Sequence, residues 1–344
     1  MNFSRIAALI FTSLLLYPIA AQATTISLPN NGGTCDGNVT NGVLNGKASC
    51  QYANKDRYVG DFANGQFSGM GKYIFADGSS YEGQFQGGQI QGKGKRIYPD
   101  GDRYEGDFAK GEPNGSGIYA AKAGGSYQGS FKNGNPDGQG TFTLKNGDRC
   151  TGIVSNGQLN GAGECAYQNG GSYKGNLANG RPAGAGLLTF ADKSSYQGDF
   201  KDGQPNGQGT RTYKNGNVYV GSYLSGKPSG QGKLTTKTQE TYVGDFSQGK
   251  FEGKGVYTFA GGDRYEGDFK SGQFSGQGVI TVKGNRCEGQ FGKGELNGQA
   301  TCSYQNSEKF TGEFKNGERD GKGTLTYANG TKIDGIWKAG KLQS

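Results

Sequence analysis

The fold is decided by the stretch Tyr104–Gly117, YEGDFAKGEPNGSG, because its pattern recurs along most of the 344-residue chain. With Tyr104 as position 1, glycine stands at positions 3, 8, 12 and 14 and phenylalanine at position 5. The residues at position 1 are Cys35, Tyr58, Tyr81, Tyr104, Tyr127, Cys150, Tyr173, Tyr196, Tyr219, Tyr242, Tyr265, Cys287, Phe310 and Ile333. This spacing gives thirteen whole repeats of 22 or 23 residues over residues 35–332 and a half repeat over residues 333–344.

Each repeat contains two short runs in which large residues alternate with glycine or polar residues. Positions 1, 3 and 5 form the first run, and positions 14, 16 and 18 form the second, as in Gly71, Tyr73 and Phe75. A period of two residues is typical of a β-strand. Turn pairs such as Asn64-Gly65 and Asp77-Gly78 separate the runs. The pattern therefore predicts one β-hairpin for each repeat, with a second turn leading to the next hairpin.

A single hairpin is only marginally stable in water, so the hairpins are expected to stack and bury their rings against one another. The chain contains 68 glycines, 20 tyrosines and 19 phenylalanines. Glycines at positions 3 and 14 would leave room for rings from neighbouring strands. We therefore predict an all-β fold, an elongated single-layer antiparallel β-sheet solenoid of stacked hairpins.

The six cysteines test the register of the predicted hairpin. They form three pairs, Cys35/Cys50, Cys150/Cys165 and Cys287/Cys302, and each pair occupies positions 1 and 16 of one repeat. If these positions face each other, position 3 faces position 14 and position 5 faces position 12. Directly opposed residues lie within the Cα separation that a disulfide requires. We therefore predict three disulfides, Cys35–Cys50, Cys150–Cys165 and Cys287–Cys302, as structural links in an oxidising compartment.

The repeat resembles the MORN (membrane occupation and recognition nexus) repeat, as the stretches Tyr81–Gly94 and Tyr104–Gly117 illustrate. The resemblance covers residues 35–344. It implies a twisted, elongated, single-layer antiparallel sheet and roles in scaffolding, protein–protein contact and association with membranes. Many family members carry histidine at position 11. That position here holds other polar residues, such as Ser68, Gln91, Asn114, Asp137, Asn160 and Asn206.

The N-terminus has the pattern of an export signal. Arg5 precedes an almost wholly apolar run, residues 6–19, and Ala21-Gln22-Ala23 supplies the small residues that a signal peptidase needs. We predict a signal peptide over residues 1–23, cleaved after Ala23, a linker over residues 24–34 and the repeat array over residues 35–344. The expected location is periplasmic or extracellular, in a bacterium.

The composition argues against most kinds of enzyme. Histidine, the usual general base and the commonest metal ligand, is absent from the chain. Acid pairs at positions 2 and 4, such as Glu105/Asp107 and Glu266/Asp268, could in principle do acid–base chemistry. A one-layer sheet offers no pocket that would raise their pKa values. We therefore predict no catalytic, cofactor-binding or metal-binding residues, and no enzymatic activity.

Basic residues gather at positions 6, 7 and 9, around the first turn. Stacking would align them along one edge of the sheet, which we call the basic edge. Its residues are Lys110, Lys132, Arg181, Lys201, Lys227, Lys250, Lys270, Lys293 and Lys315. Charged turns are also a common device for solubility. A formal net charge of +8 on 344 residues does not indicate a nucleic-acid-binding protein.

The sequence thus favours an exported scaffold that acts through protein–protein contacts at the cell envelope. The alternative is peripheral binding to anionic lipid or envelope glycan through the basic edge. The expected partners are another protein or an anionic lipid or envelope polymer, with a homodimer left open and nucleic acid not expected.

Overall fold

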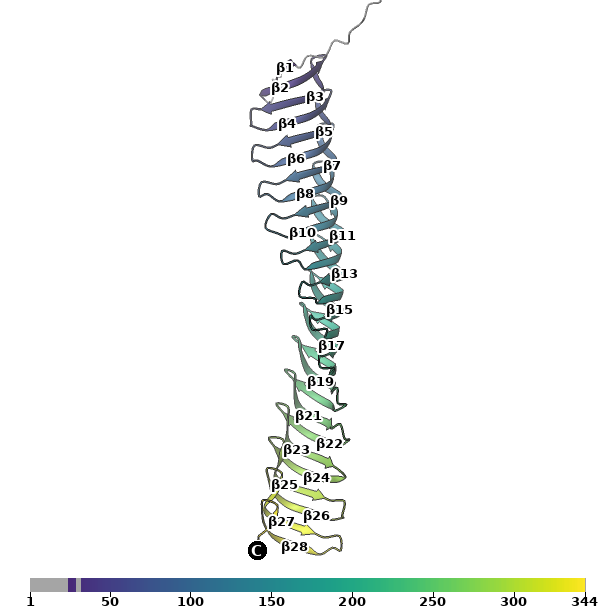
Figure 1. Ribbon diagram of the computed structural model, residues 1–344, viewed down its shortest axis with the longest axis vertical. Helices are drawn as coiled ribbons and strands as arrows, with labels where there is room; N and C mark the ends of the chain where they lie inside the picture. Colours follow the sequence, from purple (N-terminus) through teal and green to yellow (C-terminus); the bar gives the residue numbers. More distant parts are fainter. Residues whose placement is uncertain (1–23, 29–31, 344) are drawn as a thin grey trace, which may run out of the picture. The chain divides into compact units, whose positions relative to one another are not determined.

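The computed structural model describes residues 24–28 and 32–343, so the predicted signal peptide, residues 1–23, lies outside the described residues. The chain divides into two compact units. The first comprises the residues up to Lys122 with Lys132–Gly134, and the second comprises Ala123–Phe131 and Asn135–Ser344. In each unit the strands succeed one another in chain order as a single layer (Figure 1). No helix occurs in the part of the chain that the structure describes.

Strands β1 to β9 lie in the first unit, and each pairs antiparallel with the next. They are β1 (Thr24–Ser27), β2 (Gly33–Thr40), β3 (Val43–Tyr52), β4 (Arg57–Ala63), β5 (Gln66–Ile74), β6 (Ser80–Gln86), β7 (Gln89–Ile97), β8 (Arg103–Ala109) and β9 (Glu112–Ala120).

Strands β10 to β29 follow, and from β11 onward each again pairs antiparallel with the next. They are β10 (Ser126–Lys132), β11 (Asn135–Thr143), β12 (Arg149–Ser155), β13 (Gln158–Ala166), β14 (Ser172–Ala178), β15 (Arg181–Thr189), β16 (Ser195–Lys201), β17 (Gln204–Thr212), β18 (Val218–Leu224), β19 (Lys227–Thr235), β20 (Thr241–Ser247), β21 (Lys250–Thr258), β22 (Arg264–Lys270), β23 (Gln273–Val282), β24 (Asn285–Gly292), β25 (Glu295–Ser303), β26 (Lys309–Lys315), β27 (Glu318–Thr326), β28 (Lys332–Lys338) and β29 (Lys341–Leu342). The predicted all-β, single-layer antiparallel fold of hairpins is confirmed.

The hairpin register agrees with the prediction at one end and differs at the other. In β4–β5, position 1 faces position 16 (Tyr58 and Tyr73) and position 3 faces position 14 (Gly60 and Gly71). Phe62 at position 5, however, faces position 10, so the predicted pairing of positions 5 and 12 within one hairpin was wrong. Position 12 instead faces position 5 of the following repeat.

A bulge at the glycine of position 12 explains this difference. Gly69 has a φ of 63°, a conformation that glycine adopts without strain. The turned backbone places three residues of β5 opposite one residue of β4. The side chain at position 4 secures the bulge, because Asp61 Oδ2 accepts a hydrogen bond from the Met70 N–H at 3.3 Å. Gln84, Asp107, Asp199, Asp245 and Asp268 accept the equivalent bond in their repeats.

Both turns are tied to the neighbouring repeat. In the first turn, Asn64 and Gly65 have φ values of 50° and 73°, as a tight hairpin turn requires. The Asn64 N–H donates to Oδ1 of Asn45, at position 11 of the preceding repeat, at 2.9 Å. Beside the second turn, Oδ1 of Asp56 accepts the Ala76 N–H at 2.8 Å across the repeat boundary. Polar side chains at positions 11 and 22 therefore hold adjacent hairpins in register.

The core is one row of rings over pairs of glycines. Tyr58 is fully buried and stacks on Phe67, with ring centroids 4.0 Å apart. It meets Phe85 of the next repeat edge to face at 5.3 Å. Its ring covers Gly60 and Gly71, since a Cβ atom on either glycine would lie about 2.5 Å from the Tyr58 side chain. The glycines at positions 3 and 14 are therefore part of the core packing.

The three disulfides replace this ring packing in the first, sixth and twelfth repeats. The structure joins Cys35–Cys50, Cys150–Cys165 and Cys287–Cys302, each with a Cα separation of 4.0 Å. Position 14 is alanine in two of these repeats, at Ala48 and Ala300. A methyl group fits there because no tyrosine ring covers the position.

Removing the middle disulfide should weaken one hairpin. In a Cys150→Ala/Cys165→Ala variant we expect the local stability of β12–β13 to fall by about 3 kcal/mol, because the bond closes a short loop in the unfolded chain. Amide hydrogen exchange in β12–β13, with β20–β21 as an internal reference, measures this loss. Unchanged protection of β12–β13 would show that the disulfide adds nothing to the hairpin.

Three strands lie outside the thirteen repeats, apart from Lys332 at the start of β28. We expected a linker over residues 24–34, but Thr24–Ser27 forms β1, which pairs with β2. The half repeat over residues 333–344 gives β28 and the two-residue strand β29. Within the described residues, β29 pairs with Trp337 and Lys338 of β28.

Candidate binding surfaces

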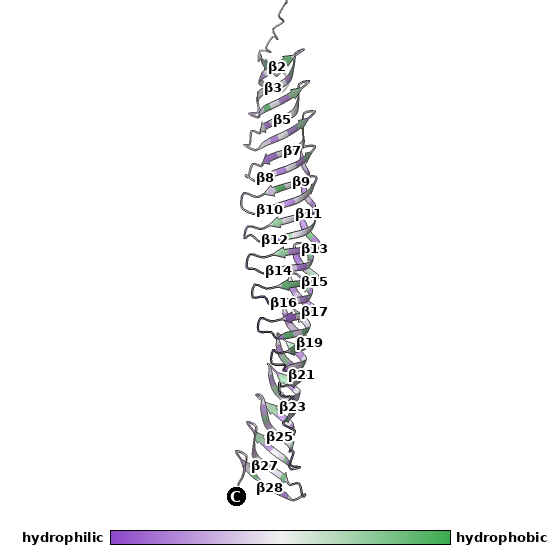
Figure 2. Cartoon of the chain, turned by 45° about the vertical axis from the view of Figure 1, so that its right-hand side comes forward, coloured by the Kyte–Doolittle hydropathy of each residue, from purple (hydrophilic) through white to green (hydrophobic). Residues whose placement is uncertain are grey.

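The pleat gives the sheet a ring face, which carries the odd positions of the first strand, and an opposite face, which carries the even positions. Hydrophobic and hydrophilic stretches alternate along the strands (Figure 2). On the ring face the residue at position 1 is buried in the tyrosine repeats, whereas the aromatic side chains at position 18 remain half-buried, except for Tyr327, which is exposed. The half-buried rings are Tyr52, Phe75, Tyr98, Tyr167, Phe190, Tyr213, Phe259 and Tyr304.

In the first unit, a shallow hollow on the ring face offers apolar contact area. It is lined by Phe67, Tyr73, Phe75, Phe85 and Ile90, with Lys110 at its rim. Phe75 packs on Tyr73 with centroids 4.6 Å apart and keeps part of its ring open to solvent. Such a half-open aromatic row suits contact with apolar side chains of another molecule.

Arginine side chains stack within the aromatic row at position 18. The Arg211 guanidinium lies over Phe190, 4.0 Å from the ring centroid, and over Tyr213 at 5.2 Å. Arg96 takes the same place over Tyr98 at 5.1 Å. Each guanidinium therefore adds a cation–π contact and a positive charge to the ring face.

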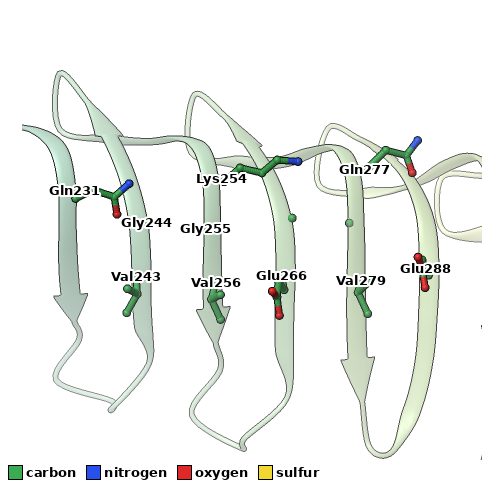
Figure 3. A pocket seen from close by; sticks show the side chains of 12 residues that line it. Gln231, Val243, Gly244, Lys254, Gly255, Val256, Glu266, Gln277, Val279 and Glu288 are labelled. Atoms are coloured by element: carbon green, nitrogen blue, oxygen red, sulfur yellow. The ribbon is translucent and has the colours of Figure 1, made fainter.

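The opposite face carries a shallow groove in the second unit (Figure 3). The glycines of positions 3 and 14, such as Gly244 and Gly255, form its floor. Residues of position 13 form one wall, and residues of positions 2 and 15 form the other. The walls comprise Gln231, Lys254 and Gln277 on one side and Val243, Val256, Glu266, Val279 and Glu288 on the other. The groove lies between these two rows of side chains and over the backbone of the glycines, whose own Cβ positions point to the ring face, toward the tyrosine at position 1.

The acid pairs considered for acid–base chemistry have structural partners here. Asp107 accepts the Ser116 N–H at 3.0 Å and pairs with Lys93 Nζ at 2.6 Å. Asp268 accepts the Gln277 N–H at 3.0 Å and pairs with Lys254 at 2.5 Å. The hydrogen bond from the neighbouring lysine is the main cause that lowers the pKa of each aspartate. A general acid needs the opposite shift.

All nine residues of the basic edge are exposed and lie at the first turn or its flanks. In the second unit, five successive hairpins from Arg181 to Lys270 carry one basic residue each, and Asp202 is the one acid at the same positions of these hairpins. Successive hairpins place these charges about 10 Å apart, from two strand spacings. Lys227 Nζ donates to Oε1 of Gln248 in the next turn at 2.9 Å.

Within the described residues, no group of three or more cysteine, aspartate or glutamate side chains is arranged to hold a metal ion. Residues 24–28 and 32–343 also contain no helix that is long and apolar enough to cross a membrane.

The family follows from a comparison of the sequence with known families. The MORN repeat model matches thirteen consecutive segments between residues 35 and 332. The chain is a MORN-repeat protein. The matched segments have the same boundaries as the repeats counted from the sequence, with one exception. The ninth segment, which begins at Tyr219, ends at residue 240 and leaves out Thr241. MORN repeats form binding scaffolds and are generally not enzymes.

The comparisons with curated proteins and with solved structures add little to this family assignment. No curated protein matches this MORN chain. Among solved structures, the TCP domain of SAS-4 from Drosophila melanogaster, in complex with a proline-rich motif of Ana2, is 15% identical, with a TM-score of 0.27. That match covers 52% of this chain and 85% of the other. A catalytically inactive virginiamycin B lyase from Staphylococcus aureus is 12% identical, with a TM-score of 0.14, and covers 91% of this chain and 98% of the other.

The structure shows what replaces the histidine of many MORN repeats at position 11. Oε1 of Gln91 accepts the Lys110 N–H of the next first turn at 3.1 Å, and Oδ1 of Asn160 accepts the Asn179 N–H at 3.1 Å. An amide oxygen at position 11 therefore ties two repeats together without histidine.

The alternation of positions 14, 16 and 18 in the sequence predicted that the side chains at position 18 share the ring face, but not that their rings remain half-buried. Sequence reasoning missed the ties from position 22. The ties from position 22 cross from one repeat to the next, and a register drawn within single hairpins does not reveal them.

Proposed function

We propose that this MORN chain is an exported, non-enzymatic scaffold that binds another protein at the cell envelope through its ring face. The hollow around Phe75 carries the proposal, because it presents part of an aromatic row to solvent on a rigid sheet. Aromatic residues that stay half-open in this way are enriched at protein–protein contacts.

Two observations support export. The N-terminal sequence has the charged, apolar and small-residue segments of a signal peptide in the correct order. The three disulfides are compatible with an oxidising compartment and less so with a reducing cytoplasm.

Two observations support a non-enzymatic role. MORN repeats account for residues 35–332, and MORN repeats are generally non-enzymatic scaffolds. Asp107 and Asp268, the aspartates of the acid pairs considered for acid–base chemistry, are held in the ionised form by lysines and backbone N–H groups. These carboxylates secure the bulges of their hairpins, which is a structural task.

Capture of partners from the envelope fraction tests the ring face. The intact protein should retain one partner in saturable amounts, and a Phe75→Ser variant should lose it. Val59→Ser is the matched control, because Val59 is an exposed apolar residue on the opposite face, with 57% of its surface accessible. Equal capture by both variants would rule out the ring face as the binding surface.

The second candidate function is binding to an anionic lipid or glycan through the basic edge. The unbroken run of five basic hairpins from Arg181 to Lys270 favours it. Each lysine near an acidic membrane contributes about 1 kcal/mol. Replacing Lys201, Lys227, Lys250 and Lys270 by glutamine should therefore weaken salt-sensitive sedimentation with acidic vesicles by at least about a hundredfold.

The control for this experiment removes the same charge elsewhere. Glutamine at Lys174, Lys233, Lys254 and Lys322, which lie on the opposite face, should leave vesicle binding within about threefold, since charges away from the edge meet the lipid surface poorly. Similar losses in both variants would mean that net charge, and no particular edge, attracts the vesicles.

A further inference from the structure

The strand β1 has the register of the second strand of a repeat. Thr24, Thr25 and Ile26 face Gly37, Asp36 and Cys35. In a complete repeat, positions 14, 15 and 16 face positions 3, 2 and 1 of the following repeat in the same order, as β5 and β6 show. Thr24, Thr25 and Ile26 therefore stand at positions 14, 15 and 16, but their own first strand is absent from the described chain.

The next residue supports this assignment. The Leu28 N–H donates to the Gly33 carbonyl at 3.0 Å. In the second turn of a complete repeat, the Phe75 N–H donates to the Ser79 carbonyl at 2.9 Å in the same way. Leu28 therefore stands at position 18 of this incomplete repeat.

The strand β28, in contrast, is a first strand that lacks most of its second strand. It supplies positions 1 to 6 of a repeat and pairs with β27 on one side. On its other side, β29 fills positions 9 and 10, and the Gln343 N–H reaches the Ile336 carbonyl at 2.8 Å. Ile333, Asp334 and Gly335 have no strand on that side within the described residues. Ile333 remains half-buried, whereas tyrosines at position 1 are at most 2% exposed.

We propose that β1 of one copy pairs with β28 of a second copy and completes a repeat between them. The register of a complete repeat places Ile26 opposite Ile333, Thr25 opposite Asp334 and Thr24 opposite Gly335. The inference does not depend on the proposed function, because it uses only the strand register and the side chains of these two edges.

The side chains at the two edges are complementary in this register. Ile26 and Ile333 would share the ring face and bury each other. On the opposite face Thr25 would lie beside Asp334, and threonine–aspartate contacts already exist there, since Thr25 donates to Asp36 and Thr324 donates to Asp334. Because the Thr25 hydroxyl has one proton, which it already donates to Asp36, the Ile26–Ile333 pair carries the complementarity, and Thr25 adds a polar neighbour to Asp334.

The residue at position 14 gives an independent argument. Tyrosine repeats require glycine there, because a Cβ atom would meet the tyrosine ring. The described exceptions, Ala48 and Ala300, occur where position 1 is cysteine. Thr24 at position 14 has the same requirement for a first strand without an aromatic residue at position 1, and Ile333 meets that requirement.

Such a contact joins two different surfaces of the same chain, so it is heterologous and can repeat from copy to copy. The lysines near the turn do not block it. Lys338 and Lys341 lie where β29 already pairs with β28, beyond the three residues that would receive β1.

Disulfide trapping tests the proposal and copies the natural links between positions 1 and 16. Two full-length variants, Ile26→Cys and Ile333→Cys, are expressed separately so that export and any processing occur, then mixed and oxidised. Non-reducing peptide mapping should find an intermolecular bond between residues 26 and 333, at least about tenfold above the control mixture, because opposed positions meet the geometry of a disulfide.

The control mixture pairs Ile26→Cys with Ile336→Cys, since Ile336 points to the opposite face and is 59% exposed. A bond found only between two copies of residue 333 would overturn the proposal in favour of a symmetric contact. Equal trapping in both mixtures, or none in either, would also overturn it.

Sedimentation of the unmodified protein provides a second measurement. Its average mass should rise with concentration, and an Ile333→Lys variant should abolish the rise, while Ile336→Lys should retain it. A protein that stays monomeric at every concentration would contradict the proposal even if the cysteine variants failed to fold.

Discussion

A Gly255→Ala substitution should destabilise its repeat severely, although it adds a single methyl group. The Cβ atom would lie 2.5 Å from a ring carbon of Tyr242 and 2.6 Å from its hydroxyl oxygen. Tyr242 is 1% exposed, and its ring is held between Phe246, Phe251 and Phe269, so it has no free space into which to move. We expect a loss of about 3 kcal/mol, the upper part of the range for an overpacked core.

Amide hydrogen exchange in β20–β22 is the appropriate measurement, because a long repeat array need not unfold in one step. The protection of these strands should fall by about a hundredfold, which corresponds to the expected energy. Gly261→Ala is the matched control, since a Cβ atom there meets nothing within 4 Å. If the two variants behaved alike, the ring would not depend on the glycine beneath it.

Raising the pH through the range in which buried tyrosines ionise should unfold the array. Burial raises the pKa of many tyrosines at position 1 to about 12. These are Tyr58, Tyr81, Tyr104, Tyr196, Tyr219 and Tyr265. The unfolded chain releases the same protons near pH 10. The stability that comes from the neutral rings is therefore complete below pH 10 and is lost as the pH rises through 12.

Tyrosinate absorbance and far-ultraviolet circular dichroism, recorded together, measure this effect. Ionisation of the buried tyrosines and loss of strand signal should coincide in one steep transition. A Tyr265→Phe variant is the control, because Phe310 already occupies position 1 with no hydroxyl and is fully buried. Its repeat should keep more exchange protection at high pH. Gradual ionisation near pH 10 with intact strands would contradict the burial of these rings.

The sequence was sufficient to predict the hairpins, the pairing of positions 1 with 16 and 3 with 14, and the three disulfides. Each rests on strict spacing, and Cys35 and Cys50 report the register directly. The pairing of position 5 was wrong because the prediction assumed an unbroken period of two. The bulge depends on the positive φ of glycines such as Gly69. The sequence alone does not show whether a glycine is needed for a bulge or for the close approach of a ring.

The basic edge and the function were harder to predict. The edge residues follow from the repeat spacing, but a turn lysine has the same spacing whether it binds an anion or only keeps the protein soluble. The strand formed by Thr24–Ser27 was missed because it is half of a repeat without its glycine pattern. Its register became visible only through its pairing with Cys35 and Asp36.

The central claim is that each repeat is a hairpin in which position 1 faces position 16. Non-reducing peptide mapping of the unmodified protein tests it most directly. The account predicts three links, Cys35–Cys50, Cys150–Cys165 and Cys287–Cys302, each within one repeat. A link between cysteines of different repeats, or free thiols at these positions in protein purified under oxidising conditions, would contradict it.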